Sequence, residues 1–228
     1  MGQYSVLLLD ADGTLFDYDK AERNALRDTL SLYGFEFSEK ALRQFRQING
    51  ELEKQLERGE ISVNAMQSRR FARFFEAMPL QCDPGEFNSL YIKQLEQYVF
   101  LLDDADLVCG ELYQTSALYV VTNGISSVQR GRLTRSGLLP YMSGLFISEE
   151  IGFQKPHRYF FDAVFTQLGD VSRDRILIVG DSLSTDVAGG HTAGLDTCWY
   201  NPKHNSDKGA LLPTYEIGAL IELLDICG

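Results

Sequence analysis

The stretch Ser5-Val6-Leu7-Leu8-Leu9-Asp10-Ala11-Asp12-Gly13 joins a short apolar run to two carboxylates and a glycine. An apolar run of this length is typical of a strand that is covered on both faces of a parallel sheet. Asp10 and Asp12 follow where the strand ends, and side chains two residues apart can face the same cavity. Gly13 permits a tight turn close to a ligand. The stretch therefore predicts the first strand of an α/β sheet with an acidic site at its end.

Further short apolar runs alternate with helical patterns along the chain. Strand character is found in residues 4–9, 117–121, 144–147, 175–179 and 197–200. Helical spacing is found in residues 127–136, 157–168, 185–193 and 215–224. This alternation predicts a doubly wound (Rossmann-like) parallel sheet with helices on its faces. The polar residues 201–209 are expected to form a surface loop.

Residues 18–97 have a different composition, because they are rich in Glu, Gln, Arg, Leu and Phe at helical spacing and have no strand-like runs. Breaks at Gly34, at Gly59 and within residues 78–85 divide this segment into about four helices. Ser38 and Ser62 are predicted N-caps. A helical block inserted directly after the first strand predicts a helical cap domain (18–97) on an α/β core domain (1–17 and 98–228). Such a cap would stand at the carboxyl ends of the strands, where ligands bind in these sheets.

Two shorter segments of this region have interpretations of their own. The aromatic-rich residues 71–75 are interpreted as part of the core of the cap rather than as a platform for stacking a nucleobase. Residues 16–19, just past the acidic pair, are interpreted as a packed linker, with contact to a leaving group as the alternative.

Composition excludes several classes of protein. The net charge of -11 argues against binding to a nucleic-acid polymer, which would be repelled. The sequence contains no apolar run of the roughly 20 residues that span a bilayer, so no membrane association is expected. The four cysteines are scattered, form no Cys-x-x-Cys pair and argue against zinc. With no export signal, we expect a cytoplasmic protein, and a monomer by default.

Three further motifs end predicted strands or follow them. They are Thr122-Asn123-Gly124, the Lys155-Pro156 pair, and the stretch from Gly180 through Asp181 to Asp186. Each motif alone has an ordinary explanation, such as a turn, a surface lysine or a helix cap. The first acidic pair alone also fits a solvated turn, whereas a calcium loop would need later acidic positions that are missing.

Taken together, these motifs predict one site. A doubly wound sheet gathers the carboxyl ends of its strands into one crevice. The set supplies acids for a hard divalent cation, a hydroxyl and an amide for phosphoryl oxygens, and one lysine. Such a set suits phosphoryl transfer, and oxygen ligands favour Mg2+ over zinc.

In order along the chain, Asp10-x-Asp12-Gly-Thr-Leu-Phe, Thr122-Asn123-Gly124, Lys155-Pro156 and Gly180-Asp181-Ser-x-x-x-Asp186 resemble the four motifs of the haloacid dehalogenase (HAD) superfamily. The resemblance covers nearly the whole core, and the insertion is similar to the helical cap of that superfamily. More narrowly, residues 14–19 and 180–201 resemble bacterial pyrimidine 5′-nucleotidases. The resemblance implies a phosphatase whose substrate is a small phosphorylated metabolite, with a nucleoside monophosphate as the first choice.

The resemblance also implies a role for each motif residue. Asp10 would attack the phosphorus, and Asp12 would protonate the leaving group and later activate water. The remaining implied roles are Mg2+ binding by Asp10, the Asp12 carbonyl and Asp181; phosphoryl binding by Thr122, Asn123, Gly124 and Lys155; and support of the metal site or of Lys155 by Asp186.

Other functions stay open at this point. A sugar phosphate or phosphoglycolate is the alternative substrate, and phosphomutase chemistry is a further alternative for the same residues. A signalling receiver domain fits poorly, because receivers accept phosphate on a later strand and lack an inserted helical block. A binding protein on a silent HAD core is the non-enzymatic alternative, although every expected catalytic residue type is present.

Overall fold

The computed structural model describes residues 2–78, 81–206 and 211–228. Within these ranges, six strands form one parallel sheet in the order β3-β2-β1-β4-β5-β6. The strands are β1 (Val6–Leu9), β2 (Ala117–Thr122), β3 (Met142–Ile147), β4 (Ile176–Gly180), β5 (Asp196–Tyr200) and β6 (Tyr215–Ile217). The predicted α/β class with a doubly wound parallel sheet is confirmed.

The central strand β1 pairs with β2 on one side and with β4 on the other. From β1 the chain proceeds outward through β2 and β3, and then crosses to β4 and continues outward to β6. The direction of winding therefore reverses beside β1. In open parallel sheets, this reversal leaves a crevice outside the carboxyl ends of the strands.

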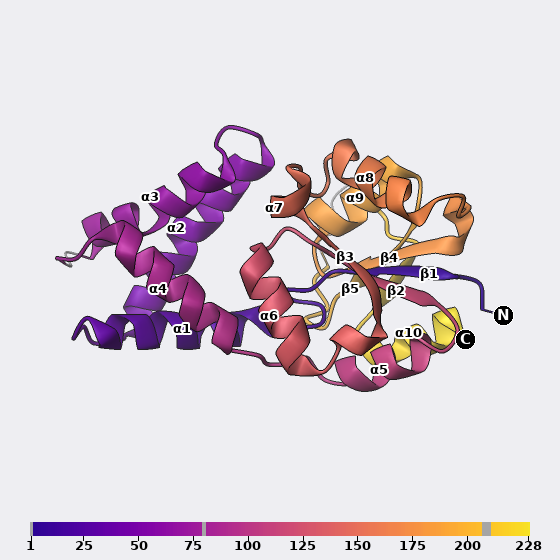
Figure 1. The fold of residues 1–228 in the computed structure, drawn as a ribbon, viewed down its shortest axis with the longest axis horizontal. Coiled ribbons are helices and arrows are strands. Elements are labelled where there is room, and N and C mark those ends of the chain that lie inside the picture. The colour runs from indigo at the N-terminus through magenta and orange to yellow at the C-terminus, as the bar shows by residue number, and fades with distance from the viewer. Residues whose placement is uncertain (1, 79–80, 207–210) are drawn as a thin grey trace. The chain divides into compact units, whose positions relative to one another are not determined.

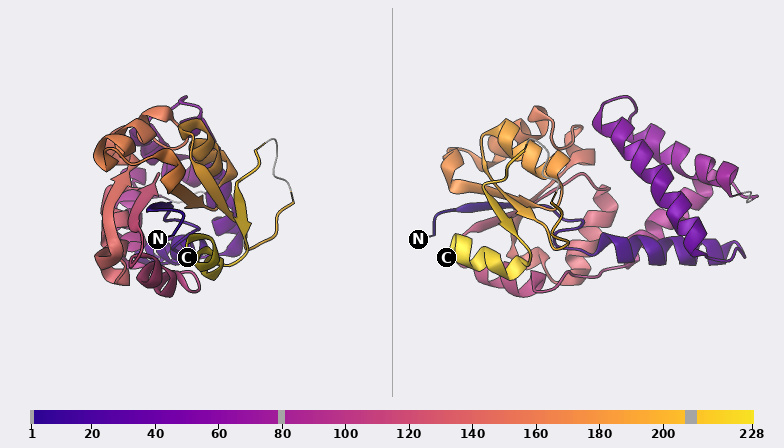
Figure 2. Two further views of the ribbon diagram at one scale, coloured as in Figure 1. Left: turned by 90° about the vertical axis from the view of Figure 1, so that its right-hand side faces the viewer. Right: turned by 180° about the vertical axis from the view of Figure 1, so that it is seen from behind.

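Helices cover both faces of the sheet (Figures 1 and 2). Alternate residues of β1 point to opposite faces, Leu7 and Leu9 into one core cluster and Val6 and Leu8 into the other. The first cluster includes residues from α5 (Ala105–Leu112), α6 (Ser126–Ser136) and α10 (Leu223–Cys227). The second includes residues from α8 (Arg158–Leu168) and α9 (Ala188–Ala193). Burial on both faces explains why β1 and β4 have purely apolar cores.

The chain divides into two compact units, one of residues 1–18 and 99–228 and the other of residues 19–98. Each boundary lies one residue beyond the one expected from the sequence. The second unit is helical, with α1 (Tyr18–Leu32) entering it from the first, followed by α2 (Glu39–Glu57), α3 (Val63–Ala77) and α4 (Pro84–Gln97). The predicted N-caps are confirmed, because Ser38 accepts a hydrogen bond from the Ala41 amide and Ser62 accepts one from the Ala65 amide.

Aromatic rings fill the interior of the helical unit. Phe71 stacks on Phe45 with ring centroids 5.2 Å apart, and it also contacts Phe87 at 4.7 Å and Tyr91 at 5.2 Å. Both Phe71 and Phe74 are fully buried. The interpretation of residues 71–75 as core is therefore confirmed. Phe16 is also buried in the first unit, as expected of a packed linker.

One expectation about secondary structure was wrong, and one helix of the core was missed. The final helix predicted over 215–224 begins only at Leu220, because Tyr215–Ile217 instead pairs with β5 as the edge strand β6. This strand has only three residues and places the charged Glu216 in solvent, as is common at the edge of a sheet. Helix α5 was not predicted, although its buried residues pack into the first core cluster.

The other predicted elements agree with the structure to within a few residues, except that a π-helical turn (Leu183–Val187) precedes α9. The short helix α7 (Ser148–Ile151) and two 3-10 turns (Leu139–Tyr141 and Arg173–Arg175) were not predicted. Within the predicted helix break, residues 79–80 lie outside the described part of the chain. Residues 201–206 of the predicted loop contain no helix or strand, and residues 207–209 also lie outside the described part. Among the described residues, no helix is both long and apolar enough to span a bilayer.

A matched pair of leucines tests the packing of the helical unit. Leu52 on α2 is fully buried, whereas Leu32 at the end of α1 is 61% exposed. We expect Leu52→Ala to lower the free energy of unfolding by about 2–5 kcal/mol, because it removes buried methyl groups and leaves a cavity. Leu32→Ala should change it by less than about 0.5 kcal/mol. Urea unfolding followed by circular dichroism measures both, and equal losses would contradict the described packing.

Candidate active site

A buried lysine links the ends of three strands. Lys155 follows β3 and α7 (Ser148–Ile151), and its ammonium donates to Asp10 Oδ1 at 2.6 Å, Asp186 Oδ1 at 2.6 Å and the Val121 carbonyl at 2.7 Å. These three bonds use every donor of the ammonium, which makes its burial tolerable. The structure thus brings together Asp10, Lys155 and Asp186, which are far apart in the sequence.

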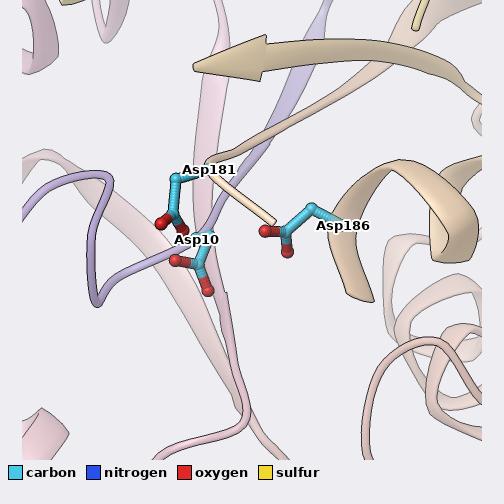
Figure 3. A group of neighbouring side chains, drawn as sticks. All are labelled: Asp10, Asp181 and Asp186. Atoms are coloured by element: carbon cyan, nitrogen blue, oxygen red, sulfur yellow. The ribbon is translucent and has the colours of Figure 1, made fainter. Parts of the chain in front are cut away.

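Three carboxylates converge at this point (Figure 3). Asp10 follows β1, Asp181 follows β4, and Asp186 belongs to the π-helical turn after β4. One carboxylate oxygen from each lies within 4.8 Å of the others. Asp186 also accepts from the Ser182 amide at 3.1 Å, which fixes its orientation. The cluster therefore has the oxygen donors and the spacing of a site for a hard divalent cation.

Two glycines make room for these carboxylates. A Cβ atom on Gly180 would lie 2.1 Å from Asp186 Oδ2, and one on Gly13 would lie 2.5 Å from Asp181 Oδ2. Gly13 also has a φ of +91°, in the region that favours glycine. Any side chain at these positions would displace a carboxylate, so the glycines of both acidic motifs have a steric role.

The carboxylates carry more negative charge than the lysine offsets. Burial raises the pKa of Asp10 well above its ordinary value; Lys155 opposes this shift, and Asp186 adds to it. Burial also lowers the pKa of Lys155, but the attraction of Asp10 and Asp186 outweighs that effect and the net pKa rises, so the ammonium stays charged.

Asp181 shows the same excess of negative charge. Desolvation raises its pKa to about 7, and repulsion by Asp186 adds to the rise. The Asp181 residue is exposed in part, and its carboxylate packs so close to Gly13 that a Cβ atom there would collide with it. When all three carboxylates are ionised, the single ammonium of Lys155 leaves two negative charges for another cation to offset. A bound Mg2+ fits this donor set in both charge and ligand type.

The Thr122-Asn123-Gly124 motif lies at the end of β2, beside the lysine. Asn123 clamps the backbone of Lys155, since its Oδ1 accepts from the Lys155 amide at 2.8 Å and its Nδ2 donates to the Lys155 carbonyl at 2.9 Å. Thr122 is buried, and its hydroxyl accepts from the Gly124 amide at 3.1 Å. The Asn123 side chain therefore fixes the lysine loop, and the Thr122 hydroxyl retains its own proton for donation.

Asp12 lies apart from the three clustered carboxylates. Its Oδ1 accepts from Arg132 Nη1 at 2.5 Å, and its Oδ2 accepts from Gln129 Nε2 at 2.5 Å. Sequence reasoning did not single out these two residues of α6. Their spacing of three within a predicted helix would have placed them on one face, but it did not indicate what that face contacts.

Two other contacts at the site were also missed. The buried Thr14 hydroxyl accepts from the Asp181 amide at 3.1 Å, and the Trp199 indole donates to the Asp181 carbonyl at 2.9 Å. Thr14 lies in the motif that begins at Asp10, but its contact with Asp181 was not predicted from the sequence. Together the two contacts hold the backbone of Asp181 at the end of β4.

Residues 7–200 match the sequence model of the family described as haloacid dehalogenase-like hydrolase. The chain belongs to this family. It is a HAD-type hydrolase, and the match covers both units of the structure. This agrees with the resemblance inferred from the four sequence motifs.

Relatives with similar sequences extend the comparison over nearly the full chain. The chain is 37% identical to the HAD-hydrolase YfnB of Bacillus subtilis, over 99% of this chain and 96% of that protein. It is 37% identical to the pyrimidine 5′-nucleotidase PynA of Streptococcus pneumoniae, over 97% and 94%. It is 32% identical to the pyrimidine 5′-nucleotidase YjjG of Escherichia coli, over 95% of each chain.

A solved structure shows the same fold. The crystal structure of YfnB, described as bound to magnesium and as revealing interdomain movement, superposes with a TM-score of 0.93 and covers 98% of each chain. These relatives support a phosphoric monoester hydrolase.

The charge balance of the site yields a pH-dependent prediction. A carboxyl whose pKa is higher in the folded protein than in the unfolded chain stabilises the fold at low pH. For Asp181 this stabilisation is lost as the pH rises from about 4, the usual value for an unfolded aspartate, to about 7. With chelator at pH 8, Asp181→Asn should therefore raise the free energy of unfolding, by on the order of 1 kcal/mol because solvent screens the partly exposed carboxylate.

With Mg2+ present, the wild type should instead be more stable than Asp181→Asn. A ligand at about 100 times its dissociation constant stabilises a folded protein by about 2.7 kcal/mol. The wild type should gain this stability from Mg2+, while Asp181→Asn should gain much less. Thermal unfolding with Mg2+ and with chelator measures both effects. An equal Mg2+ response in the two proteins would count against Asp181 as a ligand.

Proposed function

We propose that the protein is a Mg2+-dependent phosphomonoesterase that hydrolyses nucleoside 5′-monophosphates through a phosphorylated Asp10. The observation that carries the proposal is the contact of Asp10 with the Lys155 ammonium, beside Asp181 and Asp186 at the end of the central strands. A nucleophilic carboxylate next to a cation and to donors for phosphoryl oxygens is the arrangement that phosphoryl transfer requires.

In the first step, an oxygen of Asp10 attacks the phosphorus and the bond from phosphorus to the ester oxygen breaks. Asp12 gives its proton to the departing oxygen, so that the product leaves as an alcohol. The Lys155 ammonium offsets negative charge on Asp10 and on the phosphoryl group. The Thr122 hydroxyl and the Asn123 backbone amide donate to the transferring oxygens, and the Gly124 amide, which donates to the Thr122 hydroxyl, orients that hydroxyl.

In the second step, water attacks the phosphorus of the aspartyl phosphate. Asp12, now a carboxylate, takes a proton from the water, and the bond from phosphorus to Asp10 breaks. Inorganic phosphate is released, Asp10 returns as a carboxylate, and Asp12 is protonated again. Atoms and charges therefore balance over the cycle.

Mg2+ would be held by the carboxylates of Asp10 and Asp181 and by the carbonyl of Asp12, with Asp186 supporting Lys155 and the metal site. When bound, it would reduce the repulsion between the anionic nucleophile and the anionic phosphate. Asp186 contacts Lys155 directly, which suits this supporting role.

The substrate is proposed from the relatives. PynA and YjjG are named as pyrimidine 5′-nucleotidases and align over nearly the whole chain. Their alignment includes the helical unit, where substrate selection is expected in enzymes with an inserted cap. A pyrimidine nucleoside 5′-monophosphate is therefore the proposed substrate class.

The nucleophile is tested by substitution. Asp10→Asn should lower Mg2+-dependent phosphate release by at least about 10³-fold, because an amide cannot form the intermediate. Asp170→Asn, at an exposed position outside the site, serves as the control and should keep full activity. Phosphate release with Mg2+ and with chelator is the measurement. Release that ignores both Mg2+ and Asp10 would contradict the mechanism.

The substrate is tested with a panel of phosphate esters. We expect kcat/KM to be highest for pyrimidine 5′-nucleotides, followed by purine 5′-nucleotides, sugar phosphates and phosphoglycolate. A sugar phosphate or phosphoglycolate at the top of the panel would overturn the nucleotide assignment but not the mechanism. Failure to hydrolyse any ester would favour a silent binding core instead.

A further inference from the structure

Two side chains of helix α6 donate hydrogen bonds to the two carboxyl oxygens of Asp12. Arg132 Nη1 lies 2.5 Å from Asp12 Oδ1, and Gln129 Nε2 lies 2.5 Å from Asp12 Oδ2. The Asp12 side chain remains 25% exposed, whereas that of Arg132 is fully buried. Each carboxyl oxygen can form more than one hydrogen bond, so an oxygen that carries a proton can accept from α6 and still donate to a ligand. The two hydrogen bonds therefore fix the direction of the carboxyl group and leave it accessible to a ligand.

Arg132 is fully buried although its guanidinium is only partly hydrogen-bonded. Its Nε and Nη2 atoms are buried and have no hydrogen-bond partner among the described residues. The guanidinium lies 5.6 Å from the centre of the Tyr18 ring, and its ion pair is with Asp12. A buried cation with two unsatisfied nitrogens is costly for stability. A residue that serves only stability would be better replaced by an apolar one, so the arrangement points to a function at Asp12.

Gly124 makes the second contact possible. A Cβ atom on Gly124 would lie 2.3 Å from Gln129 Nε2, the atom that donates to Asp12. The glycine that ends the Thr122-Asn123-Gly124 motif therefore leaves room for the Gln129 side chain. The motif on β2 and the acid after β1 are thus connected through a residue of α6.

We infer that Arg132 and Gln129 are positioning residues that aim the Asp12 carboxyl at the leaving oxygen of the substrate. This inference rests on the proposed role of Asp12 as general acid. If the two residues position the acid, their loss should matter only where the leaving group needs a proton. The ribose oxygen of a nucleotide is strongly basic and needs one, whereas p-nitrophenolate leaves as a stable anion.

The experiment compares kcat/KM for the best nucleoside monophosphate and for p-nitrophenyl phosphate, since this ratio reports the step in which the leaving group departs. Arg132→Met should lower kcat/KM for the nucleotide by about 10²-fold, within the range of general-acid catalysis. The loss for p-nitrophenyl phosphate should be less than about threefold on the same basis. Arg132→Lys, which keeps the charge and one donor, should recover part of the activity toward the nucleotide.

Gln129→Leu keeps the test falsifiable if Arg132→Met fails to fold. It removes one hydrogen bond to a charged group and should lower kcat/KM for the nucleotide about tenfold, again sparing p-nitrophenyl phosphate. Arg130→Met is the matched control, because Arg130 lies on the same helix, is exposed and pairs with Glu150 at 2.8 Å. It should leave both substrates unchanged.

Asp12→Asn separates failure of this inference from failure of the proposed function. If Asp12→Asn affects both substrates equally, Asp12 is not the general acid and the proposed mechanism is wrong. If Asp12→Asn is selective for the nucleotide but the folded Arg132 and Gln129 variants are not, the inference alone is overturned. Equal losses on both substrates in the Arg132 and Gln129 variants would assign these residues a merely structural role.

Discussion

The burial of the Lys155 ammonium is the constraint on which the rest of the site depends. A buried cation costs least when its charge is paired and all its donors are satisfied. Here the partners come from three segments, because Asp10 follows β1, Val121 belongs to β2 and Asp186 follows β4. These strands are neighbours only because β1 lies at the centre of the sheet. The strand order thus creates the environment that makes the lysine possible, and the lysine ties the strand ends together.

The acidic pair after β1 shows how two residues of one type acquire different properties. Burial raises the pKa of Asp10, the neighbouring Lys155 ammonium lowers it, and the Asp186 and Asp181 carboxylates raise it further. Asp12 instead accepts hydrogen bonds from an arginine and a glutamine of α6. The Asp10 carboxylate thus belongs to a cluster whose excess negative charge a divalent cation would neutralise. The Asp12 carboxylate lies outside that cluster and is oriented by α6. Such a division of environments lets neighbouring carboxylates perform different chemistry.

The sequence was informative where local pattern decides the structure. Apolar runs located the five longer strands, serine caps marked α2 and α3, and the motif residues Asp10, Lys155 and Asp186 do meet at one place. It was uninformative where a tertiary contact decides. The segment 215–217 is short enough to be helix or strand, and only the exposed edge of β5 makes it a strand. Likewise, Arg132 and Gln129 are ordinary polar helix residues until the fold brings Asp12 next to them.

The glycines of the motifs connect the local sequence pattern with the tertiary contacts of the site. Gly13, Gly124 and Gly180 each occupy a position where a Cβ atom would collide with a side chain of the site, namely Asp181, Gln129 and Asp186. A glycine in a motif therefore need not contact a ligand itself to be required. Its absent side chain leaves the space in which a second motif or a neighbouring helix places a functional group. Because each glycine serves a residue from another segment, changing one of them would disturb a carboxylate or its support rather than a local turn alone. Segments that are distant in the sequence thus depend on each other sterically as well as electrostatically.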